Sequence, residues 1–285
     1  MTTSEGPELP PGACRLPEDL LLGTSSWSSK DWEGVFYPAG TPQTRYLGVY
    51  AKRFRTVEVD ATFYGPPAAS TVDRWRASVP DGFVLAAKVP QSITHEKMLE
   101  GCEDEMGAFV EVMQRMGDRL GPLLLQFPYM PRGSEMTLDR FVSRLRPFLA
   151  TLPAGPRFAV EVRNRSWLAA PLIETLRERQ VALALIDHPW MPGPKQLRRM
   201  ESDLVTAPFA YVRWLGDRHG IERITRQWSR TIVDRARETR DWMPLIRSLL
   251  SRKLAVFGYF NNHYAGHAPA SIELFEKTWA ETAPE

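Results

Sequence analysis

Short apolar runs alternate along the chain with longer segments in which apolar residues recur at helical spacing. Leu47, Tyr50, Ala51 and Phe54, for example, follow the i, i+3, i+4, i+7 pattern of a helix with one buried face. The short runs are rich in Val, Leu, Phe and Tyr, and their near-continuous apolar character predicts strands buried on both faces of a parallel sheet. The eight predicted strands are Leu20–Ser26, Thr56–Thr62, Gly82–Lys88, Pro122–Phe127, Arg157–Arg163, Val181–Asp187, Phe209–Trp214 and Leu254–Phe260.

The alternation of eight strands with helical segments is the pattern of an α/β barrel. Eight units over about 265 residues give one βα unit per roughly 33 residues, which matches a (β/α)8 TIM barrel. The weakest helical pattern, over Pro189–Pro208, leaves an irregular connection as the alternative there. We expect a single TIM-barrel domain over residues 20–285, with parallel strands and outer helices, after a Pro-rich tail over residues 1–19.

Polar or ionisable residues stand at the C-terminal end of nearly every predicted strand. In a TIM barrel this end forms the active-site face. The alternation of a strand puts Glu161 and Arg163 on one face and Val160 and Val162 on the other, so the charged pair is expected to point into the barrel mouth. The residues expected there are Glu58, Asp60, Thr62, Lys88, Gln126, Glu161, Arg163, Asp187, Arg213, Asn261 and Asn262.

Three of these residues are cations, and they predict an anionic substrate. Lys88, Arg163 and Arg213 are expected to orient and neutralise a phosphate or another anionic group, and Arg can do so through two parallel hydrogen bonds. Neutral or additional contacts to the substrate are predicted from Gln126, Asn261, Asn262, Asp60, Thr62 and His95.

The candidate catalytic residues are acidic. A carboxyl group that is buried beside cations can be tuned to act as a general acid or base, and Glu161, Asp187 and Glu58 are the candidates. Adjacent barrel strands lie about 4.8 Å apart, which predicts one hydrogen-bonded cluster. Its expected members are Glu161, Arg163, Asp187 and Arg213.

Aromatic residues follow the predicted strands on the same side. Trp27, Trp32 and Tyr37 come after the first strand, where we expect them to cover the mouth and exclude water. Packing between the loops is the structural alternative for such aromatic residues. His95 and His188 also follow strands and are placed to face the mouth.

Metal binding is a secondary alternative. No histidine stands in H-E-x-x-H or another tight ligand spacing, and the two cysteines, Cys14 and Cys102, match no metal motif. We therefore predict no metal and no cofactor. Mg²⁺ or Mn²⁺ held by Glu58, Glu161 and Asp187 stays open, because such ions need only a few carboxylates.

Composition narrows the partners and the location. Lys and Arg total 36 against 34 Asp and Glu, a formal net charge of +2, which excludes nucleic-acid binding by bulk charge. A small or anionic substrate is therefore favoured over nucleic acid. No apolar run approaches the ~20 residues that span a bilayer, and the N-terminus is no signal peptide. The expectation is a cytoplasmic protein that does not contact a membrane.

The same segments carry a family resemblance, in order from about residue 20 to 276. They are Gly23–Trp27 with Trp32–Pro38, Val57–Asp60 with Thr62–Tyr64, Lys88 with Thr94 and His95, Gly121–Pro128, Val160–Arg163 with Ser166 and Trp167, Asp187, Tyr211–Arg213, and Phe260–Asn262 with Gly266 and Ala268. In these the chain resembles the domain-of-unknown-function 72 family, also called YecE-like. The resemblance implies a TIM barrel with a site at these positions, but no reaction. Leu215 stands where the family usually has a His.

The leading hypothesis is an enzyme with hydrolase-like or lyase-like acid/base chemistry on an anionic substrate. Two alternatives come from other classes. One is a metal-dependent phosphodiesterase or endonuclease, by analogy with metal-using barrels. The other is a non-catalytic binder of a nucleic acid or metabolite, which would use aromatic stacking and arginine contacts to phosphate.

Overall fold

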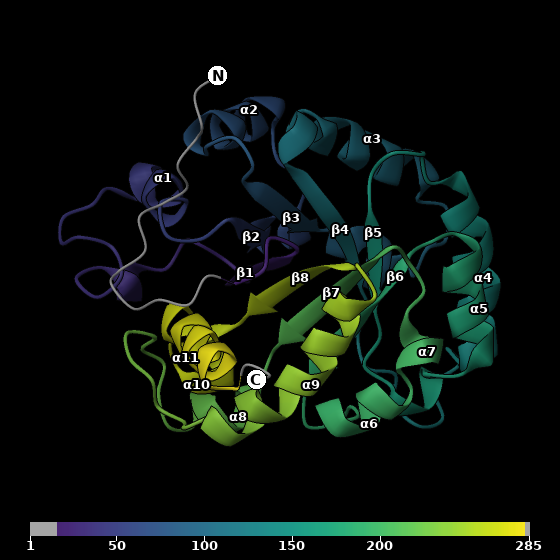
Figure 1. Ribbon diagram of the computed structural model, residues 1–285. Coiled ribbons are helices and arrows are strands. Elements are labelled where there is room, and N and C mark those ends of the chain that lie inside the picture. Colours follow the sequence, from purple (N-terminus) through teal and green to yellow (C-terminus); the bar gives the residue numbers. More distant parts are fainter. Residues whose placement is uncertain (1–15, 283–285) are drawn as a thin grey trace.

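Eight parallel strands form one sheet in the order β1-β8-β7-β6-β5-β4-β3-β2, and this sheet curves into a barrel ringed by helices (Figure 1). The structure is a computed structural model that describes residues 16–282, so most of the predicted tail lies outside the described residues. The predicted TIM-barrel fold is confirmed, and each predicted run overlaps a strand. The strands are β1 (Leu20–Thr24), β2 (Thr56–Val59), β3 (Val84–Lys88), β4 (Leu120–Gln126), β5 (Phe158–Glu161), β6 (Ala182–Asp187), β7 (Phe209–Trp214) and β8 (Ala255–Phe260).

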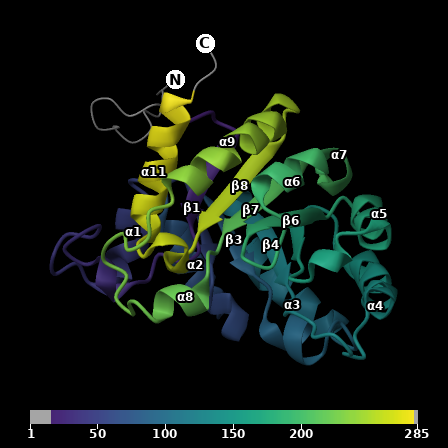
Figure 2. The ribbon, with the colours of Figure 1, turned by 90° about the horizontal axis from the view of Figure 1, so that it is seen from below.

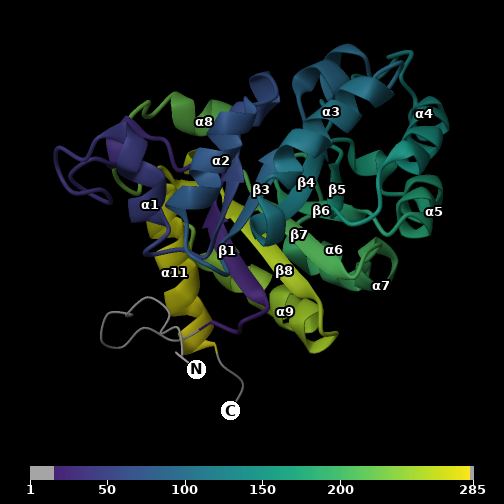
Figure 3. The ribbon, with the colours of Figure 1, turned by 90° about the horizontal axis from the view of Figure 1, so that it is seen from above.

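Helices cover the outside of the strands, with α4 beside α5 and α9 beside α11 (Figures 2 and 3). Two short helices, α6 and α7, occupy half of 189–208, so the connection there is partly helical and not wholly irregular. No helix within residues 16–282 is long and apolar enough to cross a membrane. The helices are α1 (Tyr46–Tyr50), α2 (Ala69–Ser78), α3 (Glu103–Gln114), α4 (Leu138–Thr151), α5 (Ala170–Glu178), α6 (Pro194–Arg199), α7 (Glu201–Leu204), α8 (Arg218–Glu222), α9 (Ala236–Ser251), α10 (Asn262–Ala265) and α11 (Ala268–Glu281).

The barrel interior is filled by large side chains from β7 and β8 and by small ones from β3, β5 and β6. The rings of Tyr211 and Tyr259 pack with their centroids 5.2 Å apart. Together with Phe209 and Phe257 they share one buried cluster with Ala86, Ala159, Ala182 and Ala184. Large residues opposite small ones fill a narrow barrel without voids.

The charged residues form the next layer toward the C-terminal end of the barrel. Strand residues two positions apart point to the same face. Arg213 follows Tyr211 in this way, and Glu161 follows Ala159, so both charged side chains also point inward. The fold therefore places ionisable groups directly on top of the aromatic filling.

The seam between β1 and β2 is closed by a side chain. The described residues pair β1 with β8 and β2 with β3, and no ladder joins β1 to β2. Instead the Tyr50 hydroxyl accepts from the Thr24 N–H at 2.8 Å and donates to the Thr56 carbonyl at 3.1 Å. Gly23 permits this close approach, because a Cβ atom there would lie 2.1 Å from the same carbonyl oxygen.

Strand β2 ends earlier than the sequence pattern predicts. It stops at Val59, and a 3₁₀ turn over Ala61–Tyr64 follows. The period-two alternation therefore does not extend to Thr62. Its buried hydroxyl donates to the Lys88 carbonyl at 2.7 Å and joins the ends of β2 and β3 instead of facing the mouth.

Candidate functional site

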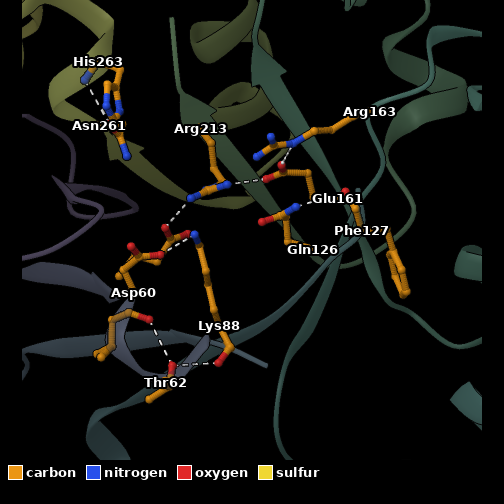
Figure 4. Close-up of polar contacts among 12 residues, drawn as sticks. Asp60, Thr62, Lys88, Gln126, Phe127, Glu161, Arg163, Arg213, Asn261 and His263 are labelled. Atoms are coloured by element: carbon orange, nitrogen blue, oxygen red, sulfur yellow. Dashed lines mark hydrogen bonds and ion pairs between the residues drawn. The ribbon is translucent and has the colours of Figure 1, made fainter. Parts of the chain in front are cut away.

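Arg213 on β7 is the centre of the charged layer (Figure 4). Its Nη2 donates to Glu58 Oε1 at 2.7 Å and its Nη1 to Glu161 Oε2 at 2.5 Å, so one guanidinium joins β2, β5 and β7 across the barrel. All three side chains are buried. The Tyr211 hydroxyl donates to the second Glu58 oxygen at 2.6 Å.

Arg163 completes the charge balance of this network. Its Nε donates to Glu161 Oε1 at 3.0 Å, and its side chain is 28% exposed at the edge of the barrel mouth. Two carboxylates then face two guanidinium groups. This neutrality matters because an unpaired buried charge costs several kcal/mol.

Glu161 is held in its ionised form. Burial acts to raise the pKa of Glu161, but the charges of Arg213 and Arg163 outweigh it and hold this pKa at about 2. All four oxygens of Glu58 and Glu161 accept hydrogen bonds from the protein. The predicted acid/base roles of these two carboxylates therefore do not fit the geometry, in which they anchor the arginines.

Asp187 does not join the cluster, and that expectation is wrong. Its Oδ2 accepts from the Trp242 indole N–H of α9 at 2.6 Å. On β6 it is Ala184 and Ile186 that face the barrel interior, so the alternation turns Asp187 outward toward the helices. Burial there raises the pKa of Asp187, and the hydrogen bond from Trp242 opposes the rise.

The alternative Mg²⁺ or Mn²⁺ site does not fit this arrangement. Glu58 and Glu161 are bridged by Arg213, and Asp187 faces another layer. Across residues 16–282 no three His, Cys, Asp or Glu side chains are grouped so that they could hold a metal ion. Leu215 is buried.

Lys88 and Asp60 form a second ion pair at the mouth (Figure 4). The Lys88 side chain is 12% exposed and that of Asp60 40%, so the pair lies nearer to solvent than Arg213. The Lys88 ammonium also lies 5.5 Å from the centre of the Phe63 ring. Gln126 is buried, and its Nε2 donates to the Phe127 carbonyl at 3.0 Å.

The two predicted amides after β8 mainly stabilise local turns. Asn261 Oδ1 accepts from the His263 N–H at 3.0 Å and caps α10, and Asn262 Oδ1 accepts from the Ala268 N–H at 3.0 Å at the start of α11. The Nδ2 of Asn261 donates no hydrogen bond within the described part of the chain, and Figure 4 shows it on the side of Arg213. The Nδ2 of Asn261 is thus available to the mouth.

The predicted aromatic cover over the mouth is wrong for two of its three members. Trp32 and Tyr37 are each 1% exposed, and the Tyr37 ring stacks on Tyr46 at 4.1 Å in the packed loop after β1. Trp27 is partly exposed and packs edge-on against Trp75 of α2 at 5.6 Å. These aromatic residues anchor the loop, which is the structural alternative.

A cavity of about 1000 Å³ opens beside Arg163 between the loops after β4, β5 and β6. Asn164 holds two of these loops together, because its side chain accepts from the Met130 N–H and donates to the Met130 carbonyl, each at 2.8 Å. The cavity is lined by residues 129–134, 136–138 and 163–167, and by Trp190. Sequence reasoning missed Tyr129 as a lining residue. Trp190, the other exposed aromatic residue of the lining, could have been found from its position directly after the sixth predicted strand.

Two histidines lie within the electrostatic reach of Arg163. Burial lowers the pKa of His95, and the positive charges of Arg163 and Lys88 lower it further. Burial and Arg163 likewise lower the pKa of His188, whose Nδ1 accepts from the Trp190 N–H at 3.3 Å. Both imidazole rings are therefore neutral at pH 7.

Comparison with known proteins agrees with this fold. The family model described as "Protein of unknown function DUF72" matches residues 21–285. The chain is 24% identical to the UPF0759 protein YunF of Bacillus subtilis, over 93% of this chain and 98% of that protein. It is 30% identical to the UPF0759 protein YecE of Escherichia coli over 150 residues, a match that spans about half of each chain. The crystal structure of a DUF72 family protein from Thermotoga maritima superposes with a TM-score of 0.70 at 25% identity, over 92% of this chain and 99% of that one.

Proposed function

The chain belongs to the DUF72 family of proteins of unknown function, and we propose that it is an enzyme that binds a small anionic substrate at Arg163 and moves a proton on that substrate. The observation that carries the proposal is the state of the Arg163 guanidinium. Its Nε is bound to Glu161, while Nη1 and Nη2 have no hydrogen-bond partner within residues 16–282. A half-used guanidinium that lines a cavity is suited to bind phosphate or carboxylate.

His95 is the proposed general base. Its neutral form at pH 7 can accept a proton, and nearby cations keep it neutral. The Thr94 hydroxyl lies 2.9 Å from His95 Nδ1 and 3.4 Å from the Pro90 carbonyl. If this hydroxyl donates to the carbonyl, it accepts from Nδ1–H, and the lone pair of Nε2 is left free. His95 takes the role that the sequence pattern suggested for Glu161 and Asp187.

His188, the second histidine that feels the charge of Arg163, is the proposed hydrogen-bond donor. Because its Nδ1 accepts from a backbone N–H, the proton of the neutral ring lies on Nε2. A neutral imidazole N–H can stabilise negative charge on a substrate without giving up its proton. The proposed site thus combines one anion-binding arginine, one proton acceptor and one neutral donor.

Titration calorimetry with inorganic phosphate tests the anion-binding step. Wild-type protein is expected to bind phosphate, and Arg163→Ala to weaken binding by roughly tenfold or more, because hydrogen bonds between charged groups are lost. Arg163→Lys restores the charge but not the fork geometry, so it is expected to recover only part of the affinity.

A matched control separates binding from folding. Arg115 pairs with the exposed Asp73 and follows α3, at the opposite end of the barrel, so Arg115→Ala is expected to bind phosphate like wild type. Melting temperatures are measured in parallel. Phosphate binding that is equal in wild type and Arg163→Ala contradicts the proposal, and so does the absence of binding of both phosphate and a carboxylate such as benzoate.

A further inference from the structure

The cavity beside Arg163 has an aromatic wall that the proposed proton transfer does not use. Tyr129 is 42% exposed and Trp190 53% exposed, and their ring centroids lie 5.2 Å apart. Both residues line the cavity, and they come from different loops, after β4 and β6. Aromatic side chains commonly line the pockets that bind small molecules.

The rest of the lining shows which ligand charge fits. The lining contains three arginines, Arg132, Arg163 and Arg165, and no Asp or Glu. Arg132 forms no ion pair within the described residues, and the Arg165 guanidinium donates to the neutral Gln196. The cavity therefore carries a net positive charge that its own walls do not neutralise. This charge favours an anionic ligand.

The same lining argues against a neutral sugar. Carbohydrate hydroxyls are commonly held by carboxylates, and the cavity wall has none. Its remaining side chains include the apolar Met130, Met136 and Leu138, and the indole of Trp167. Apolar and aromatic walls with a few polar anchors favour a flat, largely apolar ligand body.

We infer that the cavity binds a ligand in which a planar aromatic or heteroaromatic ring is joined to an anionic group. The ring stacks on Tyr129 and Trp190, and the anion reaches Arg163. The inference rests on the proposed function and adds the substrate class. The anion can be a phosphate, as in a nucleoside monophosphate, or a carboxylate, as in an aromatic acid, because a guanidinium binds both.

The cavity is already formed in this structure. Asn164 ties its two sides together through Met130, and the buried Trp167 ring stacks on Phe141 of α4 at 4.8 Å. The His188 ring packs edge-on against that of Trp190, with the ring centroids 5.0 Å apart. A preformed wall loses less conformational entropy when it binds a ring.

Calorimetry with five probes tests the ring requirement. AMP contains ring and phosphate, adenosine the ring alone, ribose 5-phosphate the anion alone, and benzoate and benzyl alcohol form the matching pair for a carboxylate. AMP or benzoate is expected to bind at least about tenfold more tightly than its partner probes, since stacking of one base contributes measurably to binding. Binding of AMP identifies the anion as a phosphate, and binding of benzoate identifies it as a carboxylate. Equal affinity for AMP and ribose 5-phosphate, with no binding of benzoate, overturns the inference.

Variants separate this inference from the proposed function. Trp190→Ala and Tyr129→Ala are expected to weaken the ring-bearing probe roughly tenfold and to leave inorganic phosphate binding unchanged. Tyr64→Ala is the matched control, because Tyr64 is 74% exposed and does not line the cavity. Unchanged binding of the ring-bearing probe to both wall variants overturns the inference while phosphate binding at Arg163 stands.

Two further outcomes are decisive. Loss of ring binding in Trp190→Ala together with full binding in Arg163→Ala supports the aromatic wall but contradicts both the proposed function and the placement of the anion at Arg163. Binding of single-stranded DNA without binding of AMP or benzoate overturns the inference in favour of a polymer.

Discussion

A buried guanidinium is stabilised by opposite charge and by hydrogen bonds. Arg213 has two carboxylate partners, Glu58 and Glu161, while its Nε is buried without a hydrogen-bond partner in the described structure. Removing one member of such a network leaves a buried charge unpaired, which costs roughly 3–5 kcal/mol. The network therefore fixes the position of Glu161, and through it the orientation of Arg163.

The depressed pKa of Glu161 predicts a specific acid sensitivity. Its pKa is about 2 in the folded protein against an ordinary value of 4.5, so its contribution to stability is complete above about pH 4.5 and is lost as the pH falls toward 2. The difference corresponds to about 3 kcal/mol. In wild type, the free energy of unfolding measured with denaturant between pH 2 and pH 7 is expected to fall as the pH drops from about 4.5 toward 2.

Glu161→Gln is expected to reduce this loss of stability at acid pH and to lower the free energy of unfolding at pH 7 by roughly 3–5 kcal/mol, because Arg213 and Arg163 lose a charged partner. Glu135→Gln is the control, since Glu135 is 90% exposed. If the free energy of unfolding of Glu161→Gln falls at acid pH as steeply as that of wild type, another group is responsible for the loss of stability.

The lowered pKa of His95 gives a second residue-scale prediction. In wild type, NMR titration of the His95 ring is expected to report a pKa below 6.5. Arg163→Ala removes a positive charge that disfavours the imidazolium, so it is expected to raise this pKa, and Arg115→Ala is expected to leave it unchanged. A wild-type value at or above 6.5 contradicts the assignment of His95 as a neutral base.

At the scale of elements, side chains complete what the backbone ladders leave open. Tyr50 at the end of α1 joins β1 to β2, and Asn164 after β5 holds the loop after β4. Each contact connects two elements that follow one another in the barrel. Tyr50 does so at the seam, and Asn164 at the C-terminal end. The shape of the mouth thus depends on a few polar side chains in addition to the sheet.

Tyr50→Phe is expected to destabilise the protein by about 1–3 kcal/mol, because the buried Thr24 N–H loses its acceptor. Hydrogen exchange of the Thr24 amide is expected to accelerate more than that of amides in β6. Tyr46→Phe is the control, since that hydroxyl makes only a 3.5 Å contact with Glu33. Equal exchange of the Thr24 amide in the two variants would count against a seam closed by Tyr50.

At the scale of the whole molecule, the barrel is layered along its axis. Aromatic and alanine side chains fill the interior, a buried charge network lies above them, and the solvent-facing pair of Lys88 and Asp60 and the cavity beside Arg163 come last. The inward-facing mouth residues comprise three acids, Glu58, Asp60 and Glu161, and three bases, Lys88, Arg163 and Arg213. Their charges balance, so attraction for an anion is local to the arginines of the cavity.

The sequence by itself determined the eight strands, their parallel arrangement and the gathering of Glu58, Glu161, Arg163 and Arg213 at one end of a barrel. Strand patterns are local, and in a barrel of βα units all strand C-termini meet on one face. These conclusions depend only on where each residue stands along its own strand and on the alternation of side chains within that strand.

Only the tertiary structure decided where the remaining side chains point. Asp187 ends its strand like Glu161, but it has the opposite alternation and bonds Trp242. The sequence predicts that Trp32 and Tyr37 cover the mouth, but both are packed inside their own loop. The cavity depends on how three loops far apart in sequence converge, and no local periodicity records that convergence, because it is set by long-range packing.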